Sequence, residues 1–195
     1  MDNMIIAIEK LIKRFRGLAI ATIIVSLSTV SACEPSNRTS EEWSRRGIVQ
    51  TQRGQLSSAL ESYNQAMELE PDNTTVLVNR GLVKDELGDY DGAIADYSSA
   101  IRLEPTLTEA YYNRANTYHN QEQYALAVED YSQAITQSPE FAYAYVNRAI
   151  NHELLGDVEQ AIADLDRAIE LFEASEAEED VQRVSQKRDE LAAGN

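Results

Sequence analysis

The sequence contains few of the residues that build catalytic and metal sites. Its 195 residues include one cysteine and two histidines. A single thiol cannot form an intramolecular disulfide, and His152-Glu153 begins a zinc-protease motif but lacks the second histidine one helical turn later. The sequence has no glycine-rich phosphate loop and no spacing that suggests a nucleophile with its base. We therefore expect a protein that is not an enzyme, has no small-molecule substrate and needs no metal or cofactor.

Positive charge is also scarce. The chain has 17 Lys and Arg residues against 33 Asp and Glu, a net charge of −16. The first 32 residues hold four basic and two acidic residues, so the remainder carries −18. Nucleic-acid binding needs a basic footprint, which this composition excludes. The acidity also disfavours a body lying flat on anionic lipid, and it suits either a generic soluble surface or a basic protein partner.

There is one long apolar run, the 16 residues from Gly17 to Ala32. It closes on Val30-Ser31-Ala32-Cys33, and four basic residues precede it: Lys10, Lys13, Arg14 and Arg16. A basic region, a short apolar segment and small residues before a cleavage point are typical of a secretory signal. The ending is similar to the bacterial lipoprotein box, in which the cysteine thiol accepts a diacylglyceryl group. We predict that residues 1–32 are a signal peptide and that Cys33 is lipidated.

An uncleaved signal anchor is the alternative, although the run is shorter than the roughly 20 residues that span a bilayer as a helix. In both cases the positive charges stay inside, so the rest of the chain lies outside the cytoplasm. Residues 33–39 then form a short tether to the membrane. The predicted location is the bacterial cell envelope, with the protein lipid-anchored and facing the periplasm or the exterior.

Prolines recur at a fixed interval after this leader. Pro71, Pro105 and Pro139 stand 34 residues apart, and a similar phrase precedes each of them. A fourth copy of the phrase ends on Glu173 in place of proline. Self-similarity of this period predicts stacked supersecondary units, because one unit cannot bury its apolar face alone. The four units are residues 40–73, 74–107, 108–141 and 142–173.

Each unit is expected to form two helices. The eighth place is small, which lets the helices approach closely: Gly47, Gly81, Ala115 and Ala149. The second helix carries a large residue between two alanines: Tyr63, Tyr97, Tyr131 and Leu165. Glycine marks the turn between the helices at Gly54, Gly88 and Gly156, because a left-handed backbone suits glycine. The third unit has Glu122 there, and we expect a less regular turn.

This pattern resembles the tetratricopeptide repeat. The third unit shows it most fully, through Tyr111, Ala115, Tyr118, Tyr124, Ala127, Tyr131, Ala134 and Pro139. The resemblance covers residues 40–173 and implies an all-α, right-handed superhelical solenoid of four helix pairs. Residues 174–195 follow as a capping helix, expected over 176–193, with a thin apolar stripe of Val181, Val184 and Leu191. A partner-binding tail is the alternative for this segment.

Charged residues also repeat with the same period. The seventh place holds Arg80, Arg114 and Arg148, and the twenty-third holds Asp96, Asp130 and Asp164. We predict a structural ladder of arginine–aspartate contacts between the two helices of each repeat, since the planar guanidinium suits a bidentate carboxylate. Pairing of each aspartate with the arginine of the next repeat is the alternative.

Binding in this family usually uses the concave groove lined by the first helices. The resemblance places these residues on it: Ile48, Val78, Leu82, Tyr112, Asn116, His119, Tyr143, Val146 and Ile150. Eight of the ten tyrosines occupy packing places of the repeat, whereas Tyr112 and Tyr143 do not, so we predict binding hot spots at these two. Packing at the groove wall is the alternative. The places of a carboxylate-clamp lysine hold Ser44, Val78, Glu109 and Tyr143, so no basic clamp is expected.

The predicted function is a membrane-anchored scaffold or adaptor outside the cytoplasm. Its partners would be proteins or peptides with apolar and basic side chains, bound in the concave groove. The alternative is a targeting chaperone for an exported or envelope-assembly subunit.

Overall fold

The structure is a computed structural model that describes residues 38–194. The segment Thr39–Asn195 forms one compact unit. The predicted signal peptide and Cys33 lie outside the described residues. Within the described part of the chain there are nine α-helices and no strand, as the repeat pattern predicts. None of these helices is long and apolar enough to span a bilayer.

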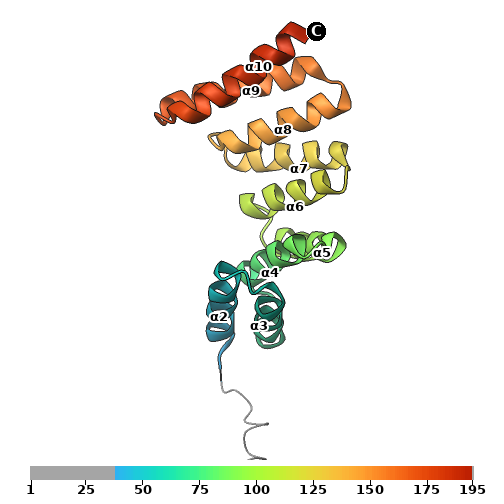
Figure 1. Cartoon of the computed structure of the whole chain (residues 1–195). Helices are drawn as coiled ribbons and strands as arrows, with labels where there is room; N and C mark the ends of the chain where they lie inside the picture. The colour runs from blue at the N-terminus through green and yellow to red at the C-terminus, as the bar shows by residue number, and fades with distance from the viewer. Residues whose placement is uncertain (1–37, 195) are drawn as a thin grey trace, which may run out of the picture. The chain divides into compact units, whose positions relative to one another are not determined.

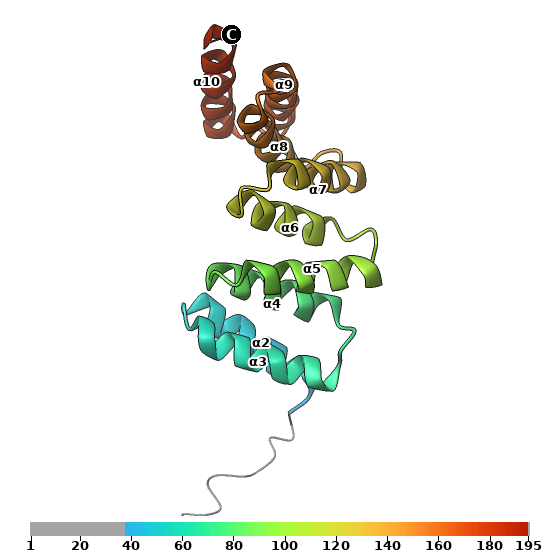
Figure 2. The same cartoon turned by 90° about the vertical axis from the view of Figure 1, so that its right-hand side faces the viewer.

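The helices follow the predicted units closely. The first repeat consists of α2 (Ser40–Gln52) and α3 (Leu56–Leu69), the second of α4 (Thr74–Glu86) and α5 (Tyr90–Leu103). The third consists of α6 (Thr108–Asn120) and α7 (Tyr124–Gln137), the fourth of α8 (Ala142–Leu155) and α9 (Val158–Ala174), and α10 (Glu178–Gly194) comes last. Each helix packs on its neighbours in sequence, so the pairs stack in chain order (Figure 1). The same order is visible from the side (Figure 2).

Side-chain caps start two of the four first helices. Thr39 accepts a hydrogen bond from the backbone N–H of Glu42, and the Glu42 carboxylate accepts one from the N–H of Thr39. This capping box satisfies two of the donors that a helix start leaves free. Asn73 caps α4 in the same way by accepting from the N–H of Val76. Thr39 and Asn73 therefore help to fix where α2 and α4 begin, whereas α6 and α8 start without a side-chain cap.

The core is a row of small clusters, roughly one for each repeat. The large residue of each second helix is buried, at 1 % exposure or less: Tyr63, Tyr97, Tyr131 and Leu165. In the first two repeats the first helix approaches this ring so closely that a side chain would not fit. A Cβ added to Gly47 would lie 2.6 Å from Cε1 of Tyr63, and the same holds for Gly81 and Tyr97. Every core cluster of the described residues lies within the compact unit Thr39–Asn195.

The turn within each repeat uses the left-handed backbone. Gly54, Gly88 and Gly156 have φ of 69°, 80° and 85°. Glu122 takes the same conformation in the third repeat, with φ of 59°. The turn there keeps the geometry of the others, so the expectation of a less regular turn is wrong; the backbone tolerates the strain of a non-glycine residue instead.

The last two helices differ from the rest. With 17 residues, α9 is longer than the 14-residue second helices of the other repeats, because no proline stops it. Next to it, α10 packs Val184, Val181 and Leu191 against the cluster that contains Phe172 and Leu165. Its first turn is acidic and its outer side is polar. The helix thus covers the apolar end of the stack, as expected of a cap.

Candidate partner-binding groove

The first helices of successive repeats form one face of the array. Across the repeat boundaries α2 contacts α4, and α4 contacts α6. On this face a hollow of about 180 Å³ opens between α6 and α8. Six residues line it: Asn116, His119, Asn120, Tyr131, Asn147 and Ile150. Three of the predicted groove residues, Asn116, His119 and Ile150, therefore meet at one site.

Hydrogen bonds hold the amides of this hollow in place. The Asn116 Oδ1 accepts from the Tyr131 hydroxyl at 2.6 Å and from Asn147 Nδ2 at 3.2 Å. Asn147 Nδ2 also donates to the hydroxyl of Tyr112 at 3.0 Å. The network joins α6, α7 and α8. The network orders these side chains before a ligand binds, so binding costs less conformational entropy.

His119 lies at the edge of the same network. Its Nδ1 is 3.0 Å from Oδ1 of Asn151, a buried residue of α8. Asn151 in turn donates from Nδ2 to the backbone carbonyl of Asn147 at 2.7 Å. No hydrogen bond within the described residues is formed by His119 Nε2 or Asn147 Oδ1. One imidazole nitrogen and one amide oxygen are therefore available to a ligand.

The two tyrosines of the network stay neutral. Burial raises the pKa of Tyr131 and of Tyr112 above the ordinary value for a phenol. The hydroxyl of Tyr131 therefore keeps its proton and its bond to Asn116. The hollow presents amide, imidazole and phenol groups with an apolar edge at Ile150, and none of its six lining residues is Asp, Glu, Lys or Arg.

Other predicted groove residues are distributed along the face. Ile48 is 37 % exposed on α2, while Leu82 and Val146 are half-buried against the cores of their repeats. Val78 is only 3 % exposed and belongs to the core that includes Tyr97. The prediction that Val78 lines the groove is therefore wrong. The seam between the second and third repeats covers its side chain.

Tyr112 is held mainly by packing. Its ring meets Tyr131 edge-on with centroids 5.8 Å apart and lies 4.6 Å from the ring of Phe141. Its hydroxyl accepts the hydrogen bond from Asn147. These contacts join the third and fourth repeats. Tyr112 therefore packs at the groove wall, which was the alternative to a binding hot spot at this residue.

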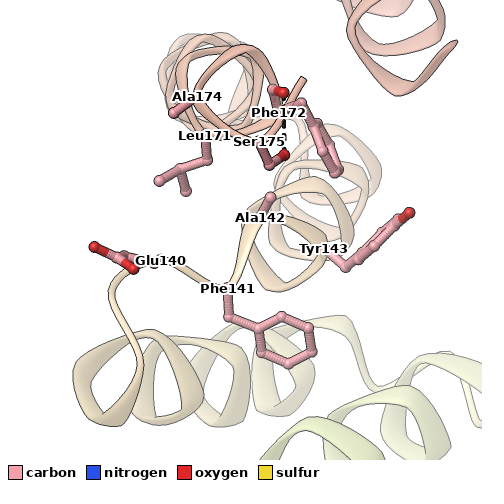
Figure 3. Close-up of a pocket in the computed structure, with 8 residues that line it drawn as sticks. All are labelled: Glu140, Phe141, Ala142, Tyr143, Leu171, Phe172, Ala174 and Ser175. Atoms are coloured by element: carbon pink, nitrogen blue, oxygen red, sulfur yellow. Dashed lines mark hydrogen bonds between the residues drawn. The ribbon is translucent and has the colours of Figure 1, made fainter. Parts of the chain in front are cut away.

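Tyr143 lies at a different place, near the end of the array. Its ring meets Phe172 edge-on at 5.1 Å, and its hydroxyl donates to Asp180 at 2.9 Å. The hydrogen bond to Asp180 raises the pKa of the Tyr143 phenol. The residue borders a separate hollow of about 400 Å³, lined by Leu171 and Phe172 of α9 and by Phe141 and Ala142 at the start of α8 (Figure 3). Tyr143 therefore contacts the cap while its side chain stays 44 % exposed, and its role as a binding hot spot stays a prediction.

The arginine–aspartate pairs lie between the two helices of each repeat. Arg80 donates from Nε and Nη2 to the two carboxylate oxygens of Asp96 at 2.8 and 2.7 Å. The distances are 2.6 and 2.8 Å for Arg114 with Asp130 and 2.8 and 2.6 Å for Arg148 with Asp164. The aspartates are buried, at 4–6 % exposure. Hydrogen bonding to Asp130 raises the pKa of Arg114, which keeps the guanidinium charged.

Each of these arginines has a second partner that the sequence pattern did not reveal. Nη1 donates to a residue of the preceding repeat: Arg80 to Asn64, Arg114 to Ser98, and Arg148 to Ser132. The partners lie 16 residues before the arginine, just as the aspartates lie 16 residues after it. The ladder therefore ties neighbouring repeats together as well as the helices within one repeat. The equal spacing of 16 residues on both sides of each arginine could have indicated these partners from the sequence.

Lys84 is a second residue of the ladder that the repeat pattern did not reveal. Its Nζ lies 2.8 Å from Oδ2 of Asp96, so this carboxylate is held by two cations. Lys84 stands one helical turn after Arg80, which would have indicated a shared partner. In the described part of the chain no group of three or more His, Cys, Asp or Glu residues could hold a metal ion.

Family models match most of the array. A model described as TPR repeat matches residues 47–84 and 86–122, and two described as tetratricopeptide repeat match residues 108–141 and 142–175. No curated protein sequence matches the chain.

Solved structures are similar in fold. A crystal structure of MamA protein superposes with a TM-score of 0.66 at 20 % identity, over 79 % of this chain and 86 % of that one. MamA from Desulfovibrio magneticus RS-1 gives 0.64 at 19 % identity, over 80 % and 96 %. The first TPR of Spaghetti (RPAP3), bound to the HSP90 peptide SRMEEVD, gives 0.59 at 20 % identity, over 60 % and 94 %. At these identities the similarity shows the fold alone.

Proposed function

Because this chain belongs to the tetratricopeptide-repeat family, whose members are generally protein–protein interaction scaffolds, we propose that it is a membrane-anchored scaffold outside the cytoplasm. It binds partner peptides on the face of its first helices. The observation that carries this proposal is the preformed hollow between α6 and α8, where ordered amide groups and an imidazole stand beside Ile150. Amides can both donate to and accept from the main chain of an extended peptide.

The charge of the groove indicates the chemistry of the partner. The RPAP3 domain is bound to SRMEEVD, a peptide with three acidic residues. In our chain the places of a basic clamp hold Ser44, Val78, Glu109 and Tyr143, and the array is strongly acidic. An acidic tail would be repelled here. A segment with apolar and basic side chains is the better complement.

Anchoring is supported by the sequence of the leader. The basic residues, the apolar run to Ala32 and the single cysteine at position 33 suit export followed by lipidation. The residues from Cys33 to Thr39 would then hold the repeats close to the membrane surface. The partner would be another component of the bacterial envelope.

A matched pair of variants tests the groove. Residues 34–195 are used as bait against an envelope extract, and the captured partner is then titrated against Ile150→Lys and Leu126→Lys. Ile150 lines the hollow, whereas Leu126 is 39 % exposed on the second helix α7. We expect at least tenfold weaker binding for Ile150→Lys, because the added charge repels a basic ligand. Equal affinity of both variants would contradict groove binding, and many weak clients in place of one stoichiometric partner would indicate a chaperone.

A further inference from the structure

A row of arginines follows the outer side of α2, the first helix of the array. Val49 lies three or four residues from each of Arg45, Arg46 and the C-cap residue Arg53, which places the four side chains on one side of the helix. We call these four residues the basic end face. They surround a hollow of about 510 Å³ together with Glu42, Gln50 and Gln55. Among the described helices, α2 packs mainly on α3 and to a lesser extent on α4.

Comparison with the second repeat explains why this face is open. Val83 stands 34 residues after Val49 and is fully buried, because α3 of the preceding repeat covers it. Val49 is 38 % exposed, since no described repeat precedes it. The first repeat therefore presents, uncovered, the surface that every later repeat uses for stacking.

The arginines of this face are not used by the ladder. Ser62 stands where the other repeats have aspartate, and it donates to Gln50 at 2.6 Å. Arg46, the counterpart of Arg80, instead lies over the ring of Trp43 at 5.3 Å. Within residues 38–194 neither Arg46 nor Arg53 forms an ion pair with a carboxylate. Arg45 pairs with Glu41 at 2.7 Å, but both side chains are largely exposed, so the pair holds Arg45 weakly.

The charge of the chain is distributed unevenly about this face. Residues 38–55 contain four arginines and two glutamates, a net charge of +2. Residues 56–195 contain nine basic and 28 acidic residues, a net charge of −19. A local basic surface on an otherwise acidic chain selects an anionic partner for one end of the array and repels it from the rest.

We propose that the basic end face docks on the anionic phospholipid headgroups of the membrane that holds the anchor, an inference that rests on the membrane anchoring in the proposed function. Six residues of sequence lead from Cys33 to Thr39, and they span at most about 20 Å when extended. This keeps the arginines near the headgroup layer. Arginine binds phosphate oxygens through its planar fork, and Val49 adds an exposed apolar side chain at the interface.

Docking by this face would set the orientation of the array. The acidic repeats are repelled by an anionic surface, so the first helix is held against the membrane while the groove remains open to partners. The rival occupant is the C-terminal end of a second copy. The hollow between the end of α9 and the start of α10 is lined in part by Glu173, Glu176, Glu178 and Val181. These acidic and apolar side chains also complement the basic end face. A short tether disfavours this arrangement, because the membrane then occupies the space beside α2.

The chain supplies both the attachment point and the probe for a test. Residues 33–195 are coupled through Cys33, the only cysteine, to a maleimide lipid in vesicles of phosphatidylcholine, with or without phosphatidylglycerol. Trp43, the only tryptophan, then reports the proximity of α2 through quenching by a headgroup spin-labelled lipid. We expect quenching to be several-fold stronger in the anionic vesicles and to weaken as salt rises.

Two triple variants decide whether the arginines are responsible. Arg45→Gln, Arg46→Gln and Arg53→Gln together should bring the anionic-to-neutral quenching ratio to about one, since each arginine near the surface is worth about fivefold in partitioning. Arg102→Gln, Arg167→Gln and Arg183→Gln remove the same charge elsewhere and should preserve the ratio. Circular dichroism checks that both variants keep their helices.

Three outcomes would overturn the proposal. They are equal quenching in neutral and anionic vesicles, an unchanged ratio in the first triple variant, and a ratio lost equally in both variants. Light scattering of the uncoupled chain adds a fourth: self-association abolished by the same three substitutions would assign this face to a second copy. The coupling chemistry replaces cellular lipidation, so failure here does not bear on whether Cys33 is the natural anchor.

Discussion

At the scale of single residues, the arginines of the ladder show how one side chain serves two contacts. The guanidinium of Arg114 binds Asp130 through two nitrogens and Ser98 of the preceding repeat through the third. The same geometry occurs at Arg80 and Arg148. Arginine has enough donors in one plane to reach both neighbours, which lysine does not. The ladder is therefore a cross-link between repeats.

Removing one aspartate tests the worth of this cross-link. Asp130→Ala leaves the charge of Arg114 in a half-buried seam without its carboxylate, and we expect the free energy of unfolding to fall by about 1–3 kcal/mol. The measurement is urea denaturation followed by circular dichroism. Asp166→Ala is the matched control, because Asp166 is 51 % exposed and pairs with Arg188 at 3.3 Å. Its loss should cost less than about 1 kcal/mol. Equal effects of the two substitutions would show that the ladder adds nothing to stability.

At the scale of helices and turns, the repeats converge on one backbone geometry from different sequences. Glycine gives the left-handed turn in three repeats, and Glu122 adopts it in the third. The flanking helices decide this, because α6 and α7 must meet at the same angle as the other pairs in order to stack. The strain at Glu122 is small beside the packing that would be lost.

This turn offers a stabilising substitution. Glu122→Gly removes the cost of a left-handed non-glycine residue, and we expect it to stabilise the chain by about 1 kcal/mol. Gly88→Ala makes the opposite change at the equivalent place, where φ is 80° and nothing lies near the new Cβ, so it should destabilise by a similar amount. Melting curves of the two variants provide the check. If Glu122→Gly lowered the melting temperature, the glutamate side chain would have a stabilising role that its backbone conformation conceals.

At the scale of the whole molecule, the two ends of the array differ in what covers them. At one end α10 lies over the last repeat with its apolar stripe inward. At the other, α2 leaves Val49 and its arginines uncovered. The predicted lipid anchor precedes this open end in the sequence.

The anchor itself is tested in the cell. If Cys33 is lipidated, the intact mass of the mature protein will show loss of residues 1–32 and the addition of acyl groups. Cys33→Ser should release the protein from the membrane or leave it unprocessed, because the thiol is the acceptor of the lipid. The charge-preserving control is Ser36→Ala in the same tether. Recovery of mature protein that retains residues 1–32 would contradict lipidation and would favour the uncleaved anchor.

The sequence alone was enough to predict the repeat architecture of the described residues, the cap and the partners within each arginine–aspartate pair. These features depend on spacing along one helix or between two adjacent helices, and the geometry of a helix pair varies little. The exposure of Val78, the environments of Tyr112 and Tyr143, and the hollow between α6 and α8 were decided only by the tertiary structure. Each depends on how a repeat lies against the next one. That contact is the sum of many side chains, and a pattern within one repeat does not record it.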